Sequence, residues 1–307
     1  VGPEELRERV EGHLAAAVAP RAVSGLGLYA ALQEADHMGT GLPDLDALLG
    51  GGFRQGQVTE LCGASPSGKT QLCHAAAVAA AREGLRTVFV SVTNAFSAER
   101  VGQMLTQEGA GGGAGGCAAA AAEPEEALLR RIRVEEVSSA PELLHALHRL
   151  RAELRPDVPG GESGAQLLVV DCPTPALAAA LSPNQTHGQA TMVAAGRLLK
   201  VAAEELKAAV VVTNYPVWPW LWDGDGGAVV ERFALGESWK GQFHTRLFLR
   251  ADNLPALGRL PPRDLLCTAT LLHAPSLPPG GRAQFWIGEA GLRPWVGGDA
   301  GVGNGES

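Results

Sequence analysis

A glycine-rich phosphate-binding pattern at residues 63–70 constrains this chain more than any other feature of its sequence. The stretch reads Gly-Ala-Ser-Pro-Ser-Gly-Lys-Thr and fits G-x-x-x-x-G-K-[ST], in which backbone amides curl around phosphate oxygens. An apolar, β-prone run at 57–62 precedes it, and an alanine-rich run at 71–82 follows it and ends at Gly84. Strand, glycine-rich turn and helix are the context that the motif requires, and the helix N-terminus adds partial positive charge. The sequence therefore predicts nucleotide binding.

The residues of this loop have distinct expected roles. Lys69 is expected to reach the β- and γ-phosphates, and the Thr70 hydroxyl is expected to ligate Mg²⁺. Lysine occurs at only four positions of the chain, which makes a chance match to the motif rare. The predicted nucleotide contacts are Gly63, Ala64, Ser65, Pro66, Ser67, Gly68, Lys69, Thr70 and Gln71.

Length and charge limit the class of protein. With 307 residues, the chain can bury the core of one large α/β domain with a small appendage. It begins at Val1 and not at a methionine, which leaves open that an N-terminal part precedes it. Its net charge of −8 argues against tight, unassisted, non-specific DNA binding, although a local basic patch or a partner could supply that function.

The cysteines and the hydropathy pattern indicate an intracellular protein outside the membrane. No apolar run is long enough to span a bilayer, and no signal peptide is visible. The five cysteines show no metal-ligand spacing and are expected to be reduced thiols of the core. They are Cys62, Cys73, Cys117, Cys172 and Cys267.

Alternating strand and helix patterns follow the phosphate loop and predict an α/β fold. Such alternation is typical of a doubly wound, mostly parallel sheet. Further strands are predicted at 86–92, 131–137, 165–171 and 208–213. Helices are predicted between them at 98–107, 140–154 and 188–207. Later strands at 245–249, 265–272 and 283–287 are expected to form an antiparallel extension, because no helix separates them.

The chain is expected to contain one core domain at 28–296. Before it, 1–27 is predicted to be a remnant N-terminal helix, at 3–18, and a linker. A short helix is expected at 28–34, and a helix beginning near Pro43 and ending at the glycines of 50–52. The glycine/alanine tract at 109–122 predicts a flexible insertion, and 297–307 predicts a disordered tail.

Polar residues at the ends of predicted strands are the candidate partners of the phosphate loop. Asp171 ends a buried strand and could hold Mg²⁺ near Thr70, as carboxylates do in phosphate-loop proteins. Thr213 and Asn214 end the next strand, where a polar pair could sense the γ-phosphate or simply cap the strand. Hydrolysis also needs a carboxylate or equivalent that orients water. The strand next to the loop ends at residues 90–94 without an acid, and the nearest carboxylate, Glu99, is expected to be solvated or to cap a helix, so no catalytic residue is assigned.

A long segment at 215–242 combines aromatic and basic residues. Loops of this length are usually functional or mobile, and aromatics interleaved with cations can stack the bases of single-stranded DNA. Packing against the body of the protein or a partner subunit is the alternative, and because four acidic residues of the segment weaken the DNA interpretation, DNA contact and partner contact stay equally open. The candidate DNA or partner contacts are Trp218, Trp220, Trp222, Arg232, Trp239 and Lys240.

These motifs together resemble the ATPase core of eukaryotic RecA-type recombinases. The resemblance rests on the stretches at 40–52, 56–61, 68–74, 168–171, 210–214 and 244–249, at the family's spacing, and covers about 28–287. Within the family, the stretches 235–239 and 208–214 look most like the D-type paralogue. The resemblance implies a RecA-like phosphate-loop NTPase fold, ATP on 63–70, Mg²⁺ near Thr70 and Asp171, and γ-phosphate sensing around Asn214.

The resemblance also implies DNA-facing loops within 182–188 and 215–242, and it exposes departures from the family pattern. Thr93 stands where strand-exchanging members carry the water-activating glutamate. Tyr215 replaces a glutamine, and His273 falls near the family's aspartate position in the segment that caps a neighbour's ATP. The sequence thus predicts an ATP-binding mediator of homologous recombination and double-strand break repair with slow ATPase at best.

This mediator is expected in the nucleus, in a hetero-oligomer with other recombinase paralogues, on single-stranded DNA and without membrane contact. Two alternatives remain open. One is an active strand-exchange recombinase that forms its own filament. The other is a nucleotide-dependent scaffold that does not contact DNA.

Overall fold

The structure is a computed structural model that describes residues 24–107, 123–154, 166–181, 185–217, 233–252 and 264–295. The chain divides into two compact units, Val1–Ala35 and Asp36–Ser307. The domain boundary after residue 27 stays a prediction from the sequence. The predicted helix at 3–18, the insertion at 109–122 and the tail at 297–307 lie outside the described residues.

In the first unit the described element is helix α2 (Gly25–Glu34). Its start is set by Ser24, whose hydroxyl oxygen accepts a hydrogen bond from the Gly27 amide at 3.0 Å. A serine in this position satisfies an amide that the first helical turn leaves unpaired. The helix therefore begins three residues before the predicted start.

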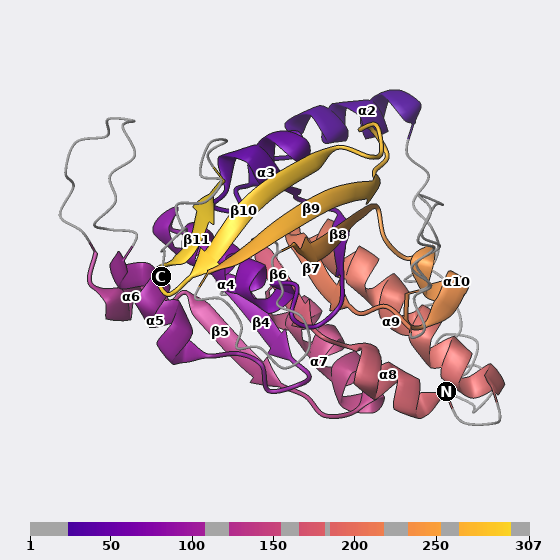
Figure 1. Ribbon diagram of the computed structural model, residues 1–307. Helices are drawn as coiled ribbons and strands as arrows, with labels where there is room; N and C mark the ends of the chain where they lie inside the picture. Colours follow the sequence, from indigo (N-terminus) through magenta and orange to yellow (C-terminus); the bar gives the residue numbers. More distant parts are fainter. Residues whose placement is uncertain are drawn as a thin grey trace, which may run out of the picture. The chain divides into compact units, whose positions relative to one another are not determined.

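In the second unit the described strands form a two-stranded and a nine-stranded sheet (Figure 1). The small sheet pairs β1 (His37–Met38) with β2 (Phe53–Arg54). The order in the large sheet is β11-β10-β9-β8-β3-β7-β6-β4-β5. Its strands are β3 (Val58–Cys62), β4 (Thr87–Ser91), β5 (Ile132–Glu136), β6 (Leu167–Asp171), β7 (Ala209–Asn214), β8 (Thr245–Ala251), β9 (Leu265–His273), β10 (Arg282–Gly288) and β11 (Gly291–Pro294).

The large sheet is mostly parallel with an antiparallel extension, as predicted. From β5 to β8 all neighbouring strands are parallel, and β8, β9, β10 and β11 follow as antiparallel neighbours. The strand predicted at 245–249 was expected to belong to the antiparallel extension, and this is wrong in part. The observed strand β8 is antiparallel to β9 but parallel to β3. The crossover that makes this possible includes the short helix α10 (Gly236–Lys240), which the sequence pattern did not reveal.

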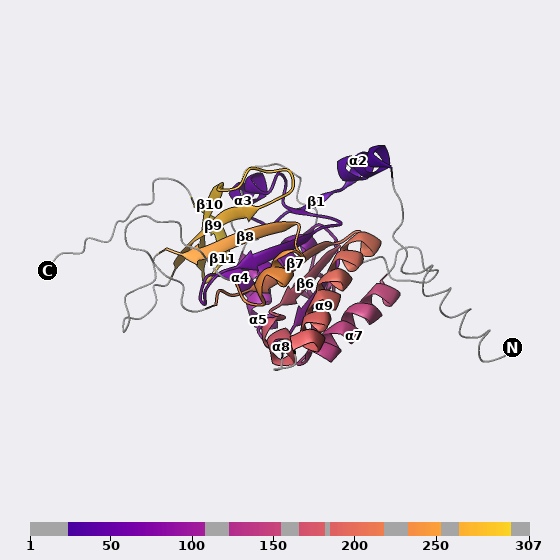
Figure 2. The same cartoon turned by 90° about the vertical axis from the view of Figure 1, so that its right-hand side faces the viewer.

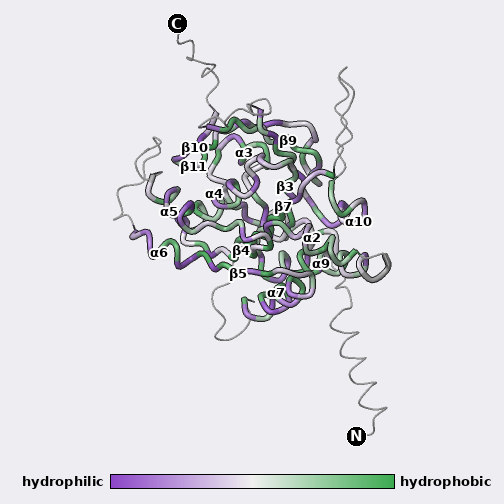
Figure 3. Tube along the Cα trace, turned by 60° about the horizontal axis from the view of Figure 1, so that its bottom comes forward, coloured by the Kyte–Doolittle hydropathy of each residue, from purple (hydrophilic) through white to green (hydrophobic). Residues whose placement is uncertain are grey.

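Helices cover both faces of the large sheet, with one apolar cluster on each face. On one face lie α3 (Pro43–Leu48), α4 (Lys69–Arg82), α5 (Ala98–Gln107) and α6 (Glu125–Leu129). On the other face lie α7 (Ala140–Glu153), α8 (Thr174–Ala180), α9 (Gln185–Leu206) and α10, and Figure 2 shows α7, α8 and α9 grouped together. Figure 3 shows hydrophilic stretches along α5, α7 and α10 at the periphery. None of the described helices combines the length and apolar character needed to cross a membrane.

Residues alternate between these two faces along the central strands. Leu61, Val169 and Val211 belong to the cluster that includes α4, and we call this side the α4 face. Val58, Val170 and Val212 belong to the cluster that includes α7 and α9, which we call the α9 face. Successive side chains of a strand point to opposite faces. Two polar residues that are adjacent in a strand therefore lie on different faces of the sheet.

The described cysteines are buried thiols, as predicted. Cys62, Cys73, Cys172 and Cys267 are free and buried, and burial raises the pKa of each thiol. Cys117 lies outside the described residues. A thiol with a raised pKa forms little thiolate near neutrality, so these four cysteines are chemically quiet parts of the core.

His74 is a buried polar residue within the α4 face cluster. Its side chain is 1% exposed, both ring nitrogens lack a described hydrogen-bond partner, and its ring meets Phe89 and Phe96 with centroids 5.5 and 5.3 Å apart. Burial, helped by the charge of Arg100, lowers the pKa of His74 to about 4. The folded protein therefore holds a neutral imidazole where the unfolded chain takes up a proton below pH 6.5.

This difference predicts acid sensitivity. The contribution of His74 to stability is complete above about pH 6.5 and is lost as the pH falls towards 4, because only the unfolded chain binds the proton there. Between pH 7 and pH 5 the free energy of unfolding should fall by roughly 2 kcal/mol through this residue. Urea unfolding at each pH should show a weaker loss in His74→Leu than in wild type. His273→Gln, at an exposed position, is the control, and an unchanged slope in His74→Leu contradicts the assignment.

Candidate nucleotide-binding site

The phosphate loop joins β3 to α4, as predicted. Gly68 has a φ of 84° and caps the helix, a conformation in which glycine alone is unstrained. A side chain at Gly63 would collide with the carbonyl oxygen of Leu249 in β8 and with the hydroxyl of Ser67. Both glycines are therefore required by local geometry, whatever the loop binds.

Lys69 is folded back onto this loop. Its ammonium donates hydrogen bonds to the carbonyl oxygens of Gly63 and Ala64 at 2.7 and 3.0 Å, and to the Ser67 hydroxyl at 3.2 Å. Burial lowers the pKa of Lys69, and the neighbouring Cys172 and Asp171 act in the opposite direction. The loop thus concentrates a cation and a helix N-terminus in one place, which is the charge arrangement that phosphate groups need.

Asp171 lies at the end of β6 and joins the neighbouring strand to the phosphate loop. Its carboxylate accepts hydrogen bonds from the Thr70 hydroxyl at 2.8 Å and from the Thr213 hydroxyl at 2.5 Å. The side chain is 2% exposed. The expected proximity of Thr70 and Asp171 is therefore observed, although neither is shown to bind a metal. Among the described residues, no group of three or more His, Cys, Asp and Glu side chains is arranged to hold a metal ion.

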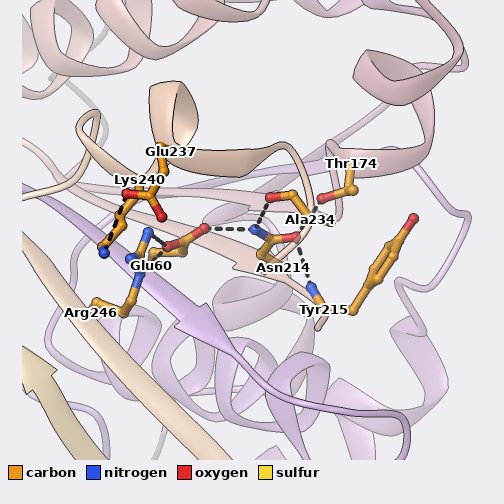
Figure 4. Close-up of polar contacts among 8 residues, drawn as sticks. All are labelled: Glu60, Thr174, Asn214, Tyr215, Ala234, Glu237, Lys240 and Arg246. Carbon is orange, nitrogen blue, oxygen red and sulfur yellow. Dashed lines mark hydrogen bonds and ion pairs between the residues drawn. The ribbon is translucent and has the colours of Figure 1, made fainter. Parts of the chain in front are cut away.

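The predicted pair Thr213 and Asn214 is divided between the two faces. Thr213 lies on the α4 face with Asp171, whereas Asn214 lies on the α9 face, where its amide is within hydrogen-bonding distance of Glu60 (Figure 4). The alternation of side chains along a strand requires this division. Of the two, only Thr213 is directed towards the phosphate loop in this arrangement.

Gln71, predicted to contact the nucleotide, is engaged by Arg100 of α5. The Arg100 guanidinium donates to the Gln71 side-chain oxygen at 2.8 Å, and to the carbonyl oxygens of Gly288 and Glu289 at 2.5 and 2.6 Å. Burial lowers the pKa of Arg100. Arg100 therefore ties α4 and α5 to the turn between β10 and β11, a role that sequence reasoning missed.

The residue expected to activate water offers a hydroxyl and no acid. Ser91, the last residue of β4, is in register with Asp171, and Thr93 follows it two positions later as an exposed side chain. Glu99 in α5 is also exposed. The end of the strand beside Asp171 thus carries no carboxylate.

The predicted DNA or partner contacts have different outcomes. Trp239 of α10 is 1% exposed, and its ring packs edge-on against Phe243 with the ring centroids 5.1 Å apart. Its side chain is therefore part of the hydrophobic core and is not accessible to DNA or a partner. Lys240 is exposed and pairs with Glu237 at 3.4 Å. Trp218, Trp220, Trp222 and Arg232 lie outside the described residues, as do 182–184.

The charged residues Glu60 and Arg246 were also missed, although the sequence contained a signal. Each is a charged residue in a strand whose side chains are mostly buried, and they lie opposite each other in β3 and β8. Charged groups are almost never fully buried unless paired. A carboxylate and a guanidinium in two buried strands could therefore have been matched, but only with knowledge of which strands are neighbours.

The fold and the loop define a phosphate-loop protein with the RecA-like recombinase fold. The crystal structure of the RadB recombinase superposes with a TM-score of 0.63 at 24% identity, over 84% of this chain and 100% of that one. The sequence profile of the Rad51 family matches residues 33–111.

Individual proteins similar to this chain also point to the Rad51 family. The chain is 31% identical to DNA repair protein RAD51 homolog 4 of Bos taurus over 277 residues, which is 89% of this chain and 78% of that protein. It is 27% identical over 279 residues to DNA repair and recombination protein RadA of Methanoculleus marisnigri, covering 82% and 74% of the two chains. The chain belongs to the Rad51 family, and the predicted resemblance to its D-type paralogue is confirmed.

The contacts of Arg100 predict a measurable contribution to stability. Arg100→Met keeps the length of the side chain but leaves two carbonyl oxygens and Gln71 without their donor, which should lower the free energy of unfolding by roughly 1–2 kcal/mol. Urea denaturation measures this loss. Arg130→Met, at an exposed arginine, is the matched control, and equal stability of the two variants would overturn the prediction.

Proposed function

We propose that this protein is an ATP-binding mediator of homologous recombination and double-strand break repair, with slow ATP hydrolysis at best. The observation that carries the proposal is a complete phosphate loop, with Thr70 and Thr213 bonded to Asp171, beside a strand end where Thr93 replaces an acid. The names of the relatives point to DNA repair and recombination. We further propose a nuclear location and assembly with other recombinase paralogues, which the resemblance to the D-type paralogue implies.

The residues present fit a nucleoside triphosphate with Mg²⁺. The loop residues 63–71 would hold the phosphates, through backbone amides and the Lys69 ammonium. Asp171 is a buried carboxylate whose described hydrogen bonds come from two neutral hydroxyls, and a cation bound with Thr70 would balance its charge. When bound, Mg²⁺ would neutralise charge on the phosphates. We assign γ-phosphate sensing to Thr213, since Asn214 faces away.

The nucleotide arm of the proposal predicts loss of binding in a single variant. Titration calorimetry with Mg²⁺-ATP should give saturable binding to wild type, which Lys69→Ala weakens by at least about tenfold because the cation facing the phosphates is gone. Lys207→Ala, at an exposed lysine remote from the loop, should bind as wild type does. Rapid hydrolysis by wild type that Lys69→Ala abolishes would contradict the weak-ATPase part of the proposal.

The DNA arm predicts salt-dependent binding. We propose contacts to single-stranded DNA or to a partner subunit from Trp218, Trp220, Trp222, Arg232 and Lys240. Fluorescence anisotropy with labelled single strands should show affinity that falls as salt rises, because counterions are released from the phosphates. Replacing the three tryptophans with alanine should weaken binding while Mg²⁺-ATP affinity is retained.

The same measurements separate the alternatives. A nucleotide-dependent scaffold would bind ATP but no DNA at any salt concentration. An active strand-exchange recombinase would form filaments with ATP and single-stranded DNA under the electron microscope. The exposed Thr93 and the net charge of −8 count against the recombinase.

A further inference from the structure

The α9 face of the sheet holds a fully buried carboxylate that the phosphate site does not use. Glu60 of β3 is 0% exposed. Arg246, in register with it on β8, donates from Nε to one carboxylate oxygen at 2.5 Å and forms an ion pair with it through Nη2. Leaving one of two buried, paired charges without its partner is strongly destabilising. The pair is therefore held in one geometry.

Asn214 completes this network, and its amide has one possible orientation. Its nitrogen donates to the other Glu60 oxygen at 2.8 Å and to the carbonyl oxygen of Ala234 at 3.2 Å. Its oxygen accepts from the Tyr215 amide and the Thr174 hydroxyl, both at 2.8 Å. A carboxylate and a carbonyl can only accept, and a backbone amide can only donate, so a flipped side chain would face the wrong partners. All four hydrogen bonds of this amide are used.

The network contacts two stretches of the chain that are close in space, one directly after β7 and one at Ala234 (Figure 4). Tyr215 directly follows β7, and Ala234 lies nineteen residues later in the sequence. The Ala234 amide donates to the Tyr215 carbonyl oxygen at 3.0 Å, and Pro216 forms an isolated bridge with Phe233. The Arg246 guanidinium lies over the Phe233 ring, 5.3 Å from its centroid. We call Glu60, Asn214 and Arg246 the clasp, and 214–217 with 233–235 the neck.

We propose that Glu60 is a positioning residue whose clasp fixes the neck independently of nucleotide. Its partners are all protein groups on the α9 face, and no capacity of the Asn214 amide remains for a phosphate. Thr213, the adjacent residue of β7, serves Asp171 on the opposite face. By contrast, the nearby Glu237–Lys240 pair is exposed, and exposed pairs contribute little. The effect of the clasp on the neck is inferred from the hydrogen bonds described above. Whether the neck positions the proposed DNA or partner contacts rests on the proposed function.

Hydrogen–deuterium exchange at the neck tests this. The double variant Glu60→Leu with Arg246→Met removes both buried charges together, a change that proteins often tolerate. It also removes an acceptor of Asn214, so the amides of Tyr215 and Ala234 should exchange at least about tenfold faster than in wild type. Glu60→Gln with Arg246→Met keeps an acceptor for Asn214 and should restore part of the protection. Saturating Mg²⁺-ATP should change exchange in wild type by less than about threefold.

A matched control removes an ion pair elsewhere. Arg151 and Glu205 join α7 to α9 through hydrogen bonds of 2.9–3.0 Å, and Arg151→Met with Glu205→Leu should leave the exchange rates of the neck amides unchanged.

If the clasp double variant does not fold, the exchange rates of the neck amides in Asn214→Ala test the inference instead. Wild-type exchange at the neck in these variants overturns the inference, as does an Mg²⁺-ATP effect as large as that of the clasp variant. Failure to bind Mg²⁺-ATP, measured separately by calorimetry, contradicts the proposed function and leaves the variant comparison decisive for the clasp.

Discussion

The burial of β3 on both faces is the constraint on which the rest of this structure depends. Its five residues are all buried, and side chains of a strand alternate between faces. The strand therefore supports two separate polar systems. Its end leads into the phosphate loop and α4, while Glu60 points into the α9 face.

The two polar systems each contain a buried carboxylate, Glu60 or Asp171, but the two carboxylates have different partners. Glu60 is neutralised within the protein by Arg246 and bonded by Asn214, which leaves it complete without any ligand. Asp171 receives two hydroxyl donors and lies near the Lys69 ammonium, and together with the Thr70 hydroxyl it offers the oxygen atoms that Mg²⁺ prefers. One carboxylate thus stabilises the arrangement of strands and of the neck, and the other remains suited to a cation. The adjacent residues Thr213 and Asn214 link the two systems along the backbone of β7.

Much of the fold was accessible from sequence because apolar runs, turn glycines and helix caps act locally. The strand and helix around the phosphate loop, the helix beginning at Pro43 and the strand ending at Asp171 all match the structure within one or two residues. The errors came from long-range pairing. Residues 245–249 were expected to be antiparallel to their neighbours, but β8 lies parallel to β3, and in the described part of the crossover from β7 the helix is the five-residue α10.

The candidate site shows the same division. Sequence alone determined the phosphate loop, the proximity of Thr70 to Asp171 and the missing acid at Thr93, because each follows from a local motif or a strand end. Only the tertiary structure decided that Trp239 serves the core, that Asn214 faces away from the loop, and that Glu60 meets Arg246. These outcomes depend on which strands are neighbours and which face each residue occupies. That information arises from packing between residues up to 186 positions apart and not from any local pattern.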